Sequence, residues 1–252
     1  MTAYFNENDP YAAQWLRNLI DAGHIAPGVV DERSIEDVKP SDLGGFTQCH
    51  FFAGIGVWSL ALRRAGWSDD RPVWTGSCPC QPFSKAGRGA GFDDERHLWP
   101  AFHWLVEQCR PAVVFGEQVA SKDADTWIDL VQADLESLGY AVGAVPFPAA
   151  GVGAPHIRDR LYWVGRFANA DCSGLQGQVQ RQPAGSAEVA SAWRSIERIH
   201  AEGIWPTWLS ESGTPALVDG APSRVVRVRA YGNAVNAEAA RVFIESVMET
   251  QP

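Results

Sequence analysis

The stretch TQCHFFAGIG (residues 47–56) decides the fold class, because a short apolar run ends in glycines and leads directly into the helical pattern of residues 57–66. The same succession recurs where PAVVFGEQVA (residues 111–120) precedes a second helical pattern (residues 125–139), and residues 71–80 contain a third apolar run. This alternation predicts an α/β fold, a doubly wound and mostly parallel sheet with helices on both faces. In such a sheet the chemistry takes place beyond the carboxyl ends of the strands.

The chain has 252 residues and a hydrophobic content of 46%, which is enough for one substantial core and a small second region. No run of about 18 apolar residues is present, so no membrane span is expected, and the first residues lack the pattern of a signal peptide. Five cysteines, without any CxxC pair, indicate reduced thiols in a cytoplasmic protein and argue against a disulfide framework and a metal site.

The net charge of −9 disfavours adhesion to nucleic acid over the whole surface, because duplex affinity depends largely on neutralising phosphates. Arginines nevertheless gather in SRVVRVRAYGN (residues 223–233) and in HIRDR (residues 156–160), so a local basic face is compatible with the sequence. Residues 166–220 are polar and lack a clear period, which indicates a small irregular region. Residues 236–250 have the pattern of a terminal amphipathic helix.

Each candidate site residue has an ordinary interpretation when it is taken alone. Gly54 and Gly56 allow close approach of a ligand to the backbone, but they also suit a plain strand-to-helix turn. Cys80 follows Pro79 in a loop where a thiolate could be exposed, although most loop cysteines are inert. Glu117 follows an apolar run, where a solvated or helix-capping carboxylate is the simpler explanation.

The joint order of the motifs is more specific than any one of them. Along the chain occur FFAGIG, SCPCQPFSKAG, GEQV, RDRLYWVG and YGNAV. This series resembles the motif series of the DNA cytosine-C5 methyltransferases, and residues 87–102 resemble the stretch after the nucleophile in that family. The resemblance implies a Rossmann-like methyltransferase domain (residues 1–165 plus 221–252) with a small target-recognition region (residues 166–220). It implies a DNA (cytosine-5-)-methyltransferase that uses S-adenosylmethionine on double-stranded DNA, of the type found in restriction–modification systems.

The resemblance also implies a role for each catalytic candidate. Cys80 is expected to attack C6 of a cytosine flipped out of the duplex, which makes C5 nucleophilic. Glu117 is expected to hydrogen-bond and protonate N3, Arg160 to hold the O2 side, and Arg158 to hold the neighbouring backbone or the catalytic loop. The cofactor-binding candidates of the same motifs are Phe52, Ala53, Gly54, Gly56, Pro79, Asn233 and Ala234.

The chain departs from the family pattern between Gly56 and Cys80, where 23 residues leave room for only one helix and one strand. Family members fit two further strand–helix units there. Residues 3–19 are similar to the family's second motif, with Glu7 in the ribose-binding position, and residues 31–43 are similar to the third motif. In that third motif Ser34 stands where an aspartate contacts the adenine, with Ile35 beside it. The sequence therefore predicts a circular permutation of the cofactor half, and the alternative is an ordinary leading helix without a cofactor role.

Further departures leave other functions open. Val57 replaces a second consecutive glycine, Gln118 replaces the asparagine after the glutamate, and His156 replaces a glutamine. The first alternative function is a folate-dependent cytosine C5 hydroxymethyltransferase that takes its one-carbon unit from 5,10-methylenetetrahydrofolate. The second is a catalytically silent DNA-binding module. The same cysteine chemistry is also compatible with RNA as the substrate.

Overall fold

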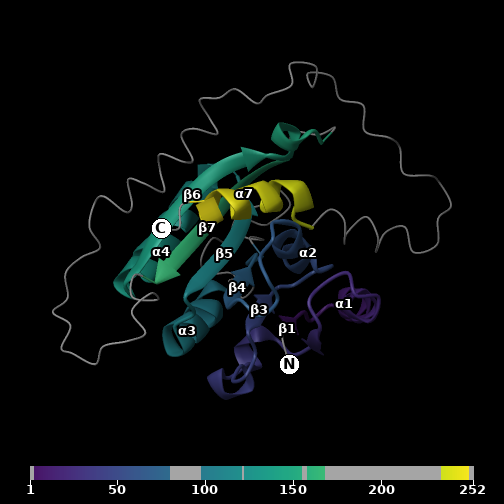
Figure 1. Cartoon of the computed structure of the whole chain (residues 1–252). Helices are drawn as coiled ribbons and strands as arrows, with labels where there is room; N and C mark the ends of the chain where they lie inside the picture. Colours follow the sequence, from purple (N-terminus) through teal and green to yellow (C-terminus); the bar gives the residue numbers. More distant parts are fainter. Residues whose placement is uncertain (1–2, 80–97, 121, 155–157, 168–233, 250–252) are drawn as a thin grey trace.

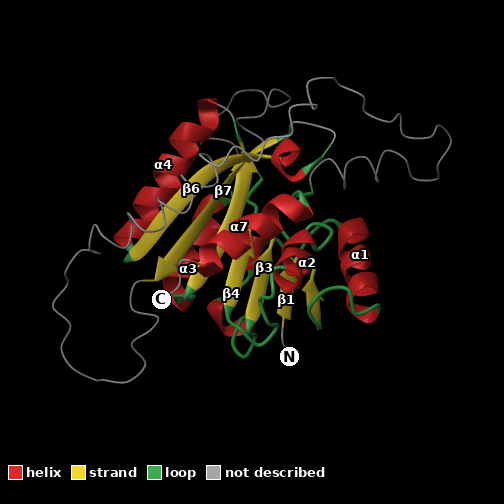
Figure 2. Ribbon diagram, turned by 45° about the horizontal axis from the view of Figure 1, so that its top comes forward, coloured by secondary structure: helices red, strands yellow, loops and turns green. Residues whose placement is uncertain are grey.

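The computed structural model describes residues 3–79, 98–120, 122–154, 158–167 and 234–249 (Figures 1 and 2). These residues form a seven-stranded sheet with the order β2-β1-β3-β4-β5-β7-β6. Strands β1 to β5 pair in parallel, whereas β7 is antiparallel to both of its neighbours. The predicted fold class, a mostly parallel α/β sheet with helices on both faces, is confirmed.

The described elements agree with the expected alternation of strands and helices. The strands are β1 (Ala3–Asn6), β2 (Gly28–Asp31), β3 (Gln48–Phe51), β4 (Val73–Gly76), β5 (Val113–Val119), β6 (Tyr140–Pro148) and β7 (Asp159–Phe167). The α-helices are α1 (Pro10–Asp21), α2 (Val57–Arg64), α3 (Trp99–Cys109), α4 (Lys122–Ser137) and α7 (Ala237–Glu249). Three short 3-10 helices are η1 (Ile35–Asp37), η2 (Pro40–Asp42) and η4 (Ala149–Val152).

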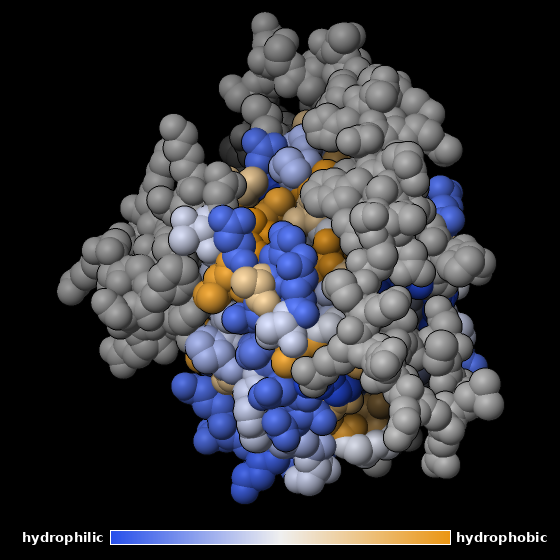
Figure 3. All heavy atoms as spheres, turned by 90° about the vertical axis from the view of Figure 1, so that its left-hand side faces the viewer, coloured by the Kyte–Doolittle hydropathy of each residue, from blue (hydrophilic) through white to orange (hydrophobic). Residues whose placement is uncertain are grey.

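Two apolar layers cover the two faces of the sheet, because alternate strand residues point to opposite sides. On β5, Val114 packs into the cluster that includes α3 and α4, whereas Phe115 packs into the cluster of α2 and α7. In Figure 2, α7 lies across the sheet near β5 and β7, on the side of α2. Seen from the left-hand side of Figure 1, hydrophobic residues gather in a band between more hydrophilic ones (Figure 3).

The register aligns the carboxyl ends of the parallel strands. The successive partners across β2, β1, β3, β4 and β5 are Asp31, Asn6, Phe51, Gly76 and Gly116. The segments that follow this line are therefore neighbours, although they are far apart in the sequence. This is the edge at which the sequence predicts the chemistry.

The two outer strands of the described sheet differ in composition. β6 carries Pro146 and Pro148, and proline within a sheet is confined to edge positions because it has no N–H to donate. β2 contains no proline and is four residues long. Within the part of the chain that the structure describes, no helix is long and apolar enough to span a membrane.

Several sequence predictions fall outside the described residues. Cys80 and Asn233 lie there, as does nearly all of the expected target-recognition region (residues 166–220). The division into a catalytic domain and a recognition region therefore stays a prediction.

Candidate active site

A buried ion pair joins two catalytic candidates at the carboxyl end of β5. Glu117 lies within β5 and is buried, and the antiparallel strand β7 brings Arg160 to it. The Nε atom of Arg160 lies 2.6 Å from Oε1 of Glu117, and both side chains are largely shielded from solvent. A charge-assisted contact of this length fixes the orientation of the carboxyl group.

Burial raises the pKa of Glu117, while the positive charges of Arg160 and Arg158 act in the opposite direction. The carboxyl group therefore holds a proton at higher pH than an exposed glutamate does. A group with this property can donate a proton to a base that becomes more negative during a reaction. The arrangement can therefore serve as a proton donor beside a fixed positive charge.

Arg158 is tied to the segment that precedes α7. Its Nη2 donates to the carbonyl oxygen of Ala234 at 2.5 Å, across 76 positions of sequence. Its backbone has a φ of 36°, which is unusual for a residue with a side chain. Burial lowers the pKa of its guanidinium. The structure thus brings together Arg158, a predicted catalytic residue, and Ala234, a predicted cofactor-binding residue.

The chain that leads toward Cys80 is held by two side chains. Trp58 Nε1 donates to Ser77 Oγ at 2.9 Å, and Gln118 Nε2 donates to the carbonyl oxygen of Cys78 at 3.3 Å. Oε1 of Gln118 also accepts the main-chain N–H of Val119 at 2.9 Å, which fixes the amide. The described part of the loop therefore leaves the sheet beside the residue that follows Glu117.

Glu7 contacts the glycine loop that follows β3. One of its carboxylate oxygens accepts the N–H of Gly54 at 2.7 Å, and the other accepts the N–H of Asp9 at 2.9 Å. Gly54 and Gly56 have φ values of 54° and 78°, where a side chain would be strained. A direct hydrogen bond thus joins Glu7, from the N-terminal stretch, to Gly54, from the glycine loop. A carboxylate of this kind is an acceptor for hydroxyl groups as well as for main-chain N–H groups.

The remaining cofactor candidates are distributed around this loop. Phe52 and Ala53 are half-buried, and the ring of Phe52 lies edge-on to Phe102 at 6.2 Å. Pro79 is exposed at the end of the described loop. Ile35 is buried in the hydrophobic core.

Asp31 ends β2, three residues before Ser34, and is not among the residues predicted from the motifs. It accepts hydrogen bonds from Tyr4 at 2.7 Å and from Arg33 at 2.6 Å. Burial alone would raise the pKa of Asp31, but these bonds and the charge of Arg33 lower it to about 2. Ser34 instead donates to the neighbouring Glu36 at 3.3 Å. The signal that could have identified Asp31 is its place directly after the apolar run GVV.

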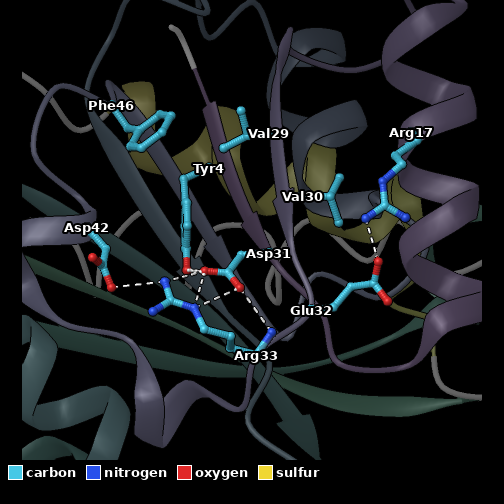
Figure 4. Close-up of a pocket in the computed structure, with 9 residues that line it drawn as sticks. All are labelled: Tyr4, Arg17, Val29, Val30, Asp31, Glu32, Arg33, Asp42 and Phe46. Atoms are coloured by element: carbon cyan, nitrogen blue, oxygen red, sulfur yellow. Dashed lines mark hydrogen bonds and ion pairs between the residues drawn. The ribbon is translucent and has the colours of Figure 1, made fainter.

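An open groove follows the outer edge of β2 (Figure 4). Its charged side chains bind each other, since Arg17 contacts Glu32 at 2.5 Å and Arg33 bridges Asp31 and Asp42. The residues that line it are Tyr4, Arg17, Val29, Val30, Asp31, Glu32, Arg33, Asp42 and Phe46. The described residues contain no group of three or more histidines, cysteines or acids arranged to hold a metal ion.

The part of the chain that contains Glu117 and Arg160 is similar to a known protein family. Residues 68–191 match the family model of the C-5 cytosine-specific DNA methylases. The chain is similar to this family over that range. The matched range contains Cys80, Glu117, Arg158 and Arg160, and it supports the family resemblance inferred from the motifs.

Individual methylases align with about half of the chain. The type II methyltransferase M.HhaI of Haemophilus parahaemolyticus is 26% identical over 167 residues, which are 51% of this chain and 51% of that protein. M.PspPI of a Psychrobacter species is 33% identical over 171 residues, 51% of this chain and 41% of its own length. The chain thus spans about half the length of these curated relatives.

A solved structure of a Spodoptera frugiperda DNMT2 mutant superimposes on 71% of this chain and 47% of its own chain, with 15% identity and a TM-score of 0.44.

Proposed function

We propose that the chain is a DNA (cytosine-5-)-methyltransferase, which transfers a methyl group from S-adenosylmethionine to C5 of a flipped cytosine in double-stranded DNA. The observation that carries this proposal is the buried Glu117–Arg160 pair, with a 2.6 Å contact at the sheet edge. There the loop toward Cys80 begins beside Gln118. The names of the type II methyltransferases among its relatives support a role in a restriction–modification system.

The residues of this chain divide the reaction between them. The thiolate of Cys80 adds to C6, and the electron pair of the C5–C6 double bond shifts toward C5 and the ring system. Glu117 in its acid form donates a proton to N3 as negative charge develops there, and Arg160 keeps a positive charge on the same side. Bound S-adenosylmethionine supplies an electrophilic methyl group. Loss of the C5 proton to a base then re-forms the C5–C6 double bond and expels the Cys80 thiolate, while N3 returns its proton to Glu117.

We further propose that the cofactor lies at the carboxyl ends of β3, β1 and β2. The Gly54–Glu7 hydrogen bond supports this placement, because it joins the glycine loop to a carboxylate that can accept ribose hydroxyls. The order β2-β1-β3-β4 supports the circular permutation, since the two strands that come first in the chain lie beside β3 on its far side from β4. Phe52, Ala53, Gly56 and Pro79 belong to the same proposed site, together with Ser34, Ile35, Asn233 and Ala234.

Glu7→Gln is expected to weaken the binding of S-adenosylmethionine by roughly 10- to 100-fold. The new amide nitrogen must face an N–H of Gly54 or Asp9, and the negative charge that accepts both donors is lost. Calorimetric titration of the full chain measures the affinity. Glu107→Gln is the matched control, because that carboxylate is exposed on α3 and belongs to no proposed site, and it should bind as the wild type does. Equal affinity of the Glu7 and Glu107 variants would contradict the proposed site.

The function is tested by nucleoside mass analysis of duplex DNA after incubation with the chain. One reaction contains S-adenosylmethionine and the other contains 5,10-methylenetetrahydrofolate. A gain of one methyl group on cytosine with the first donor alone is the expected result. A hydroxymethyl gain with the second donor alone would replace the proposed cofactor and keep the cysteine chemistry. Absence of product with both donors, on DNA of random sequence, would favour the silent DNA-binding module.

A further inference from the structure

Tyr162 lies directly beside the proposed general acid. It is the antiparallel partner of Glu117 in the β5–β7 register, so the two side chains project from the same face of the sheet. Directly opposed residues of this kind have Cβ atoms about 5 Å apart. Tyr162 is 1% exposed and Glu117 is 7% exposed, so the ring and the carboxyl group share one buried environment.

The ring of Tyr162 is held in place on several sides. The rings of Phe243, Trp58 and Phe147 surround it at centroid distances of 5.6, 6.2 and 6.3 Å. Its hydroxyl oxygen accepts the main-chain N–H of Asn236. The side chain of Asn236 in turn accepts the N–H of Ala239 at 3.0 Å in the first turn of α7. The ring is therefore a fixed apolar wall rather than a side chain that can swing away from Glu117.

The charged groups around Glu117 and the apolar ring of Tyr162 have opposite effects on the protonation of Glu117. Arg160 lies in β7 and Arg158 directly precedes that strand, and the positive charge of each favours the carboxylate form of Glu117. On the β4 side the described loop carries the buried Cys78, whose carbonyl oxygen contacts Gln118. The helices α2 and α7 contribute apolar residues around Tyr162. An apolar wall favours the neutral acid, because it excludes the water that would solvate the charge. The two arginines thus favour the charged form of Glu117, whereas the ring of Tyr162 favours its neutral form.

We propose that Tyr162 is a positioning residue whose ring keeps water away from Glu117 and thereby keeps that carboxyl group in its proton-donating form. The inference rests on the proposed function, since the acid form matters only if Glu117 donates to the cytosine ring. It adds a residue that does not touch the substrate but decides how much of the enzyme is ready to react at a given pH.

The test measures the titration of Glu117 directly in the full chain labelled with ¹³C at the glutamate carboxyl carbons, with Glu117→Gln used to assign the signal. Tyr162→Leu is expected to let water reach the carboxyl group and to lower the pKa of Glu117 by about 1 or more. Tyr162→Phe keeps the ring and is expected to titrate close to the wild type. If Tyr162→Leu does not fold, Tyr162→Met is measured in its place, because it leaves less empty volume.

Tyr140 provides the matched control. It is a second buried tyrosine of the same sheet, and its hydroxyl donates to the carbonyl oxygen of Pro111 at 2.7 Å. Tyr140→Leu should leave the titration of Glu117 unchanged. An unchanged titration in Tyr162→Leu, or an equal change in Tyr140→Leu, would overturn the inference.

The pH profile of methyl transfer gives a second readout. Activity falls as Glu117 loses its proton, so a lower pKa in Tyr162→Leu moves the alkaline limb of kcat/KM to lower pH. The NMR titration does not need turnover. A wild type that shows no methyl transfer would therefore overturn the proposed function, while the effect of Tyr162 on Glu117 would still be decided.

Discussion

Cys80→Ser is expected to reduce methyl transfer by at least about 1,000-fold, the scale on which loss of a nucleophile acts in other enzymes. A serine hydroxyl stays protonated at neutral pH and adds to C6 far more slowly than a thiolate does. The substitution exchanges one atom. The contacts that hold the preceding residues, from Trp58 to Ser77 and from Gln118 to Cys78, are untouched. Binding of the cofactor and of DNA should therefore survive.

Cys78→Ser is the matched control for this prediction. Cys78 lies two positions earlier and is buried, and its contact with Gln118 uses the carbonyl oxygen rather than the sulfur. This variant should retain most of the activity. Transfer of a labelled methyl group to duplex DNA measures both variants, and thermal unfolding checks that both are folded. Equal activity of Cys80→Ser and the wild type would contradict the proposed covalent mechanism. Loss of activity in Cys78→Ser alone would show that Cys78, and not Cys80, is the nucleophile.

Gly116→Ala is expected to lower the free energy of unfolding by more than about 3 kcal/mol, the upper end for overpacked interiors. A Cβ atom at this position would lie 2.1 Å from the indole ring of Trp163. Trp163 is fully buried and packs edge-on to Trp99 at 6.0 Å, so the indole cannot move aside without disturbing the core. Because Gly116 precedes Glu117, the same displacement would separate Glu117 from Arg160.

Gly143→Ala serves as the control, since Gly143 lies in β6 of the same sheet and an added Cβ meets no atom within 4 Å. Its stability should remain within about 0.5 kcal/mol of the wild type, as is usual for open positions. Urea unfolding followed by fluorescence measures both variants. A stable Gly116→Ala protein would show that the indole of Trp163 has room to shift.

The fold class could be predicted because hydrophobic periodicity is a local property of the sequence. Residues 47–66 already contain β3, the glycine loop and α2 in the expected order. The N-terminal stretch likewise forms a strand with Glu7 directly after it, followed by a helix, as its pattern predicts. The bond between Glu7 and Gly54 needed the structure, because sequence alone does not say which strands are neighbours.

The environment of Glu117 could not be predicted from its own stretch. Its burial and its contact with Arg160 depend on the register between β5 and β7, and a slip of one residue would turn Tyr162 to the opposite face. The position of Asp31 was missed for a different reason. β2 is only four residues long, and the ends of short strands are the least certain part of a sequence-based prediction.

Pro146 and Pro148 on β6, an outer strand of the described sheet, have a consequence for the behaviour of concentrated solutions. A neighbouring molecule that tried to add a strand there would find gaps in the row of hydrogen-bond donors. The ladder could not continue from one copy into the next, so growth of ordered aggregates along this edge is discouraged. β6 pairs with β7, which carries Arg160 and Tyr162. The prolines of β6 therefore also keep the strands around the site from pairing with a strand of another molecule.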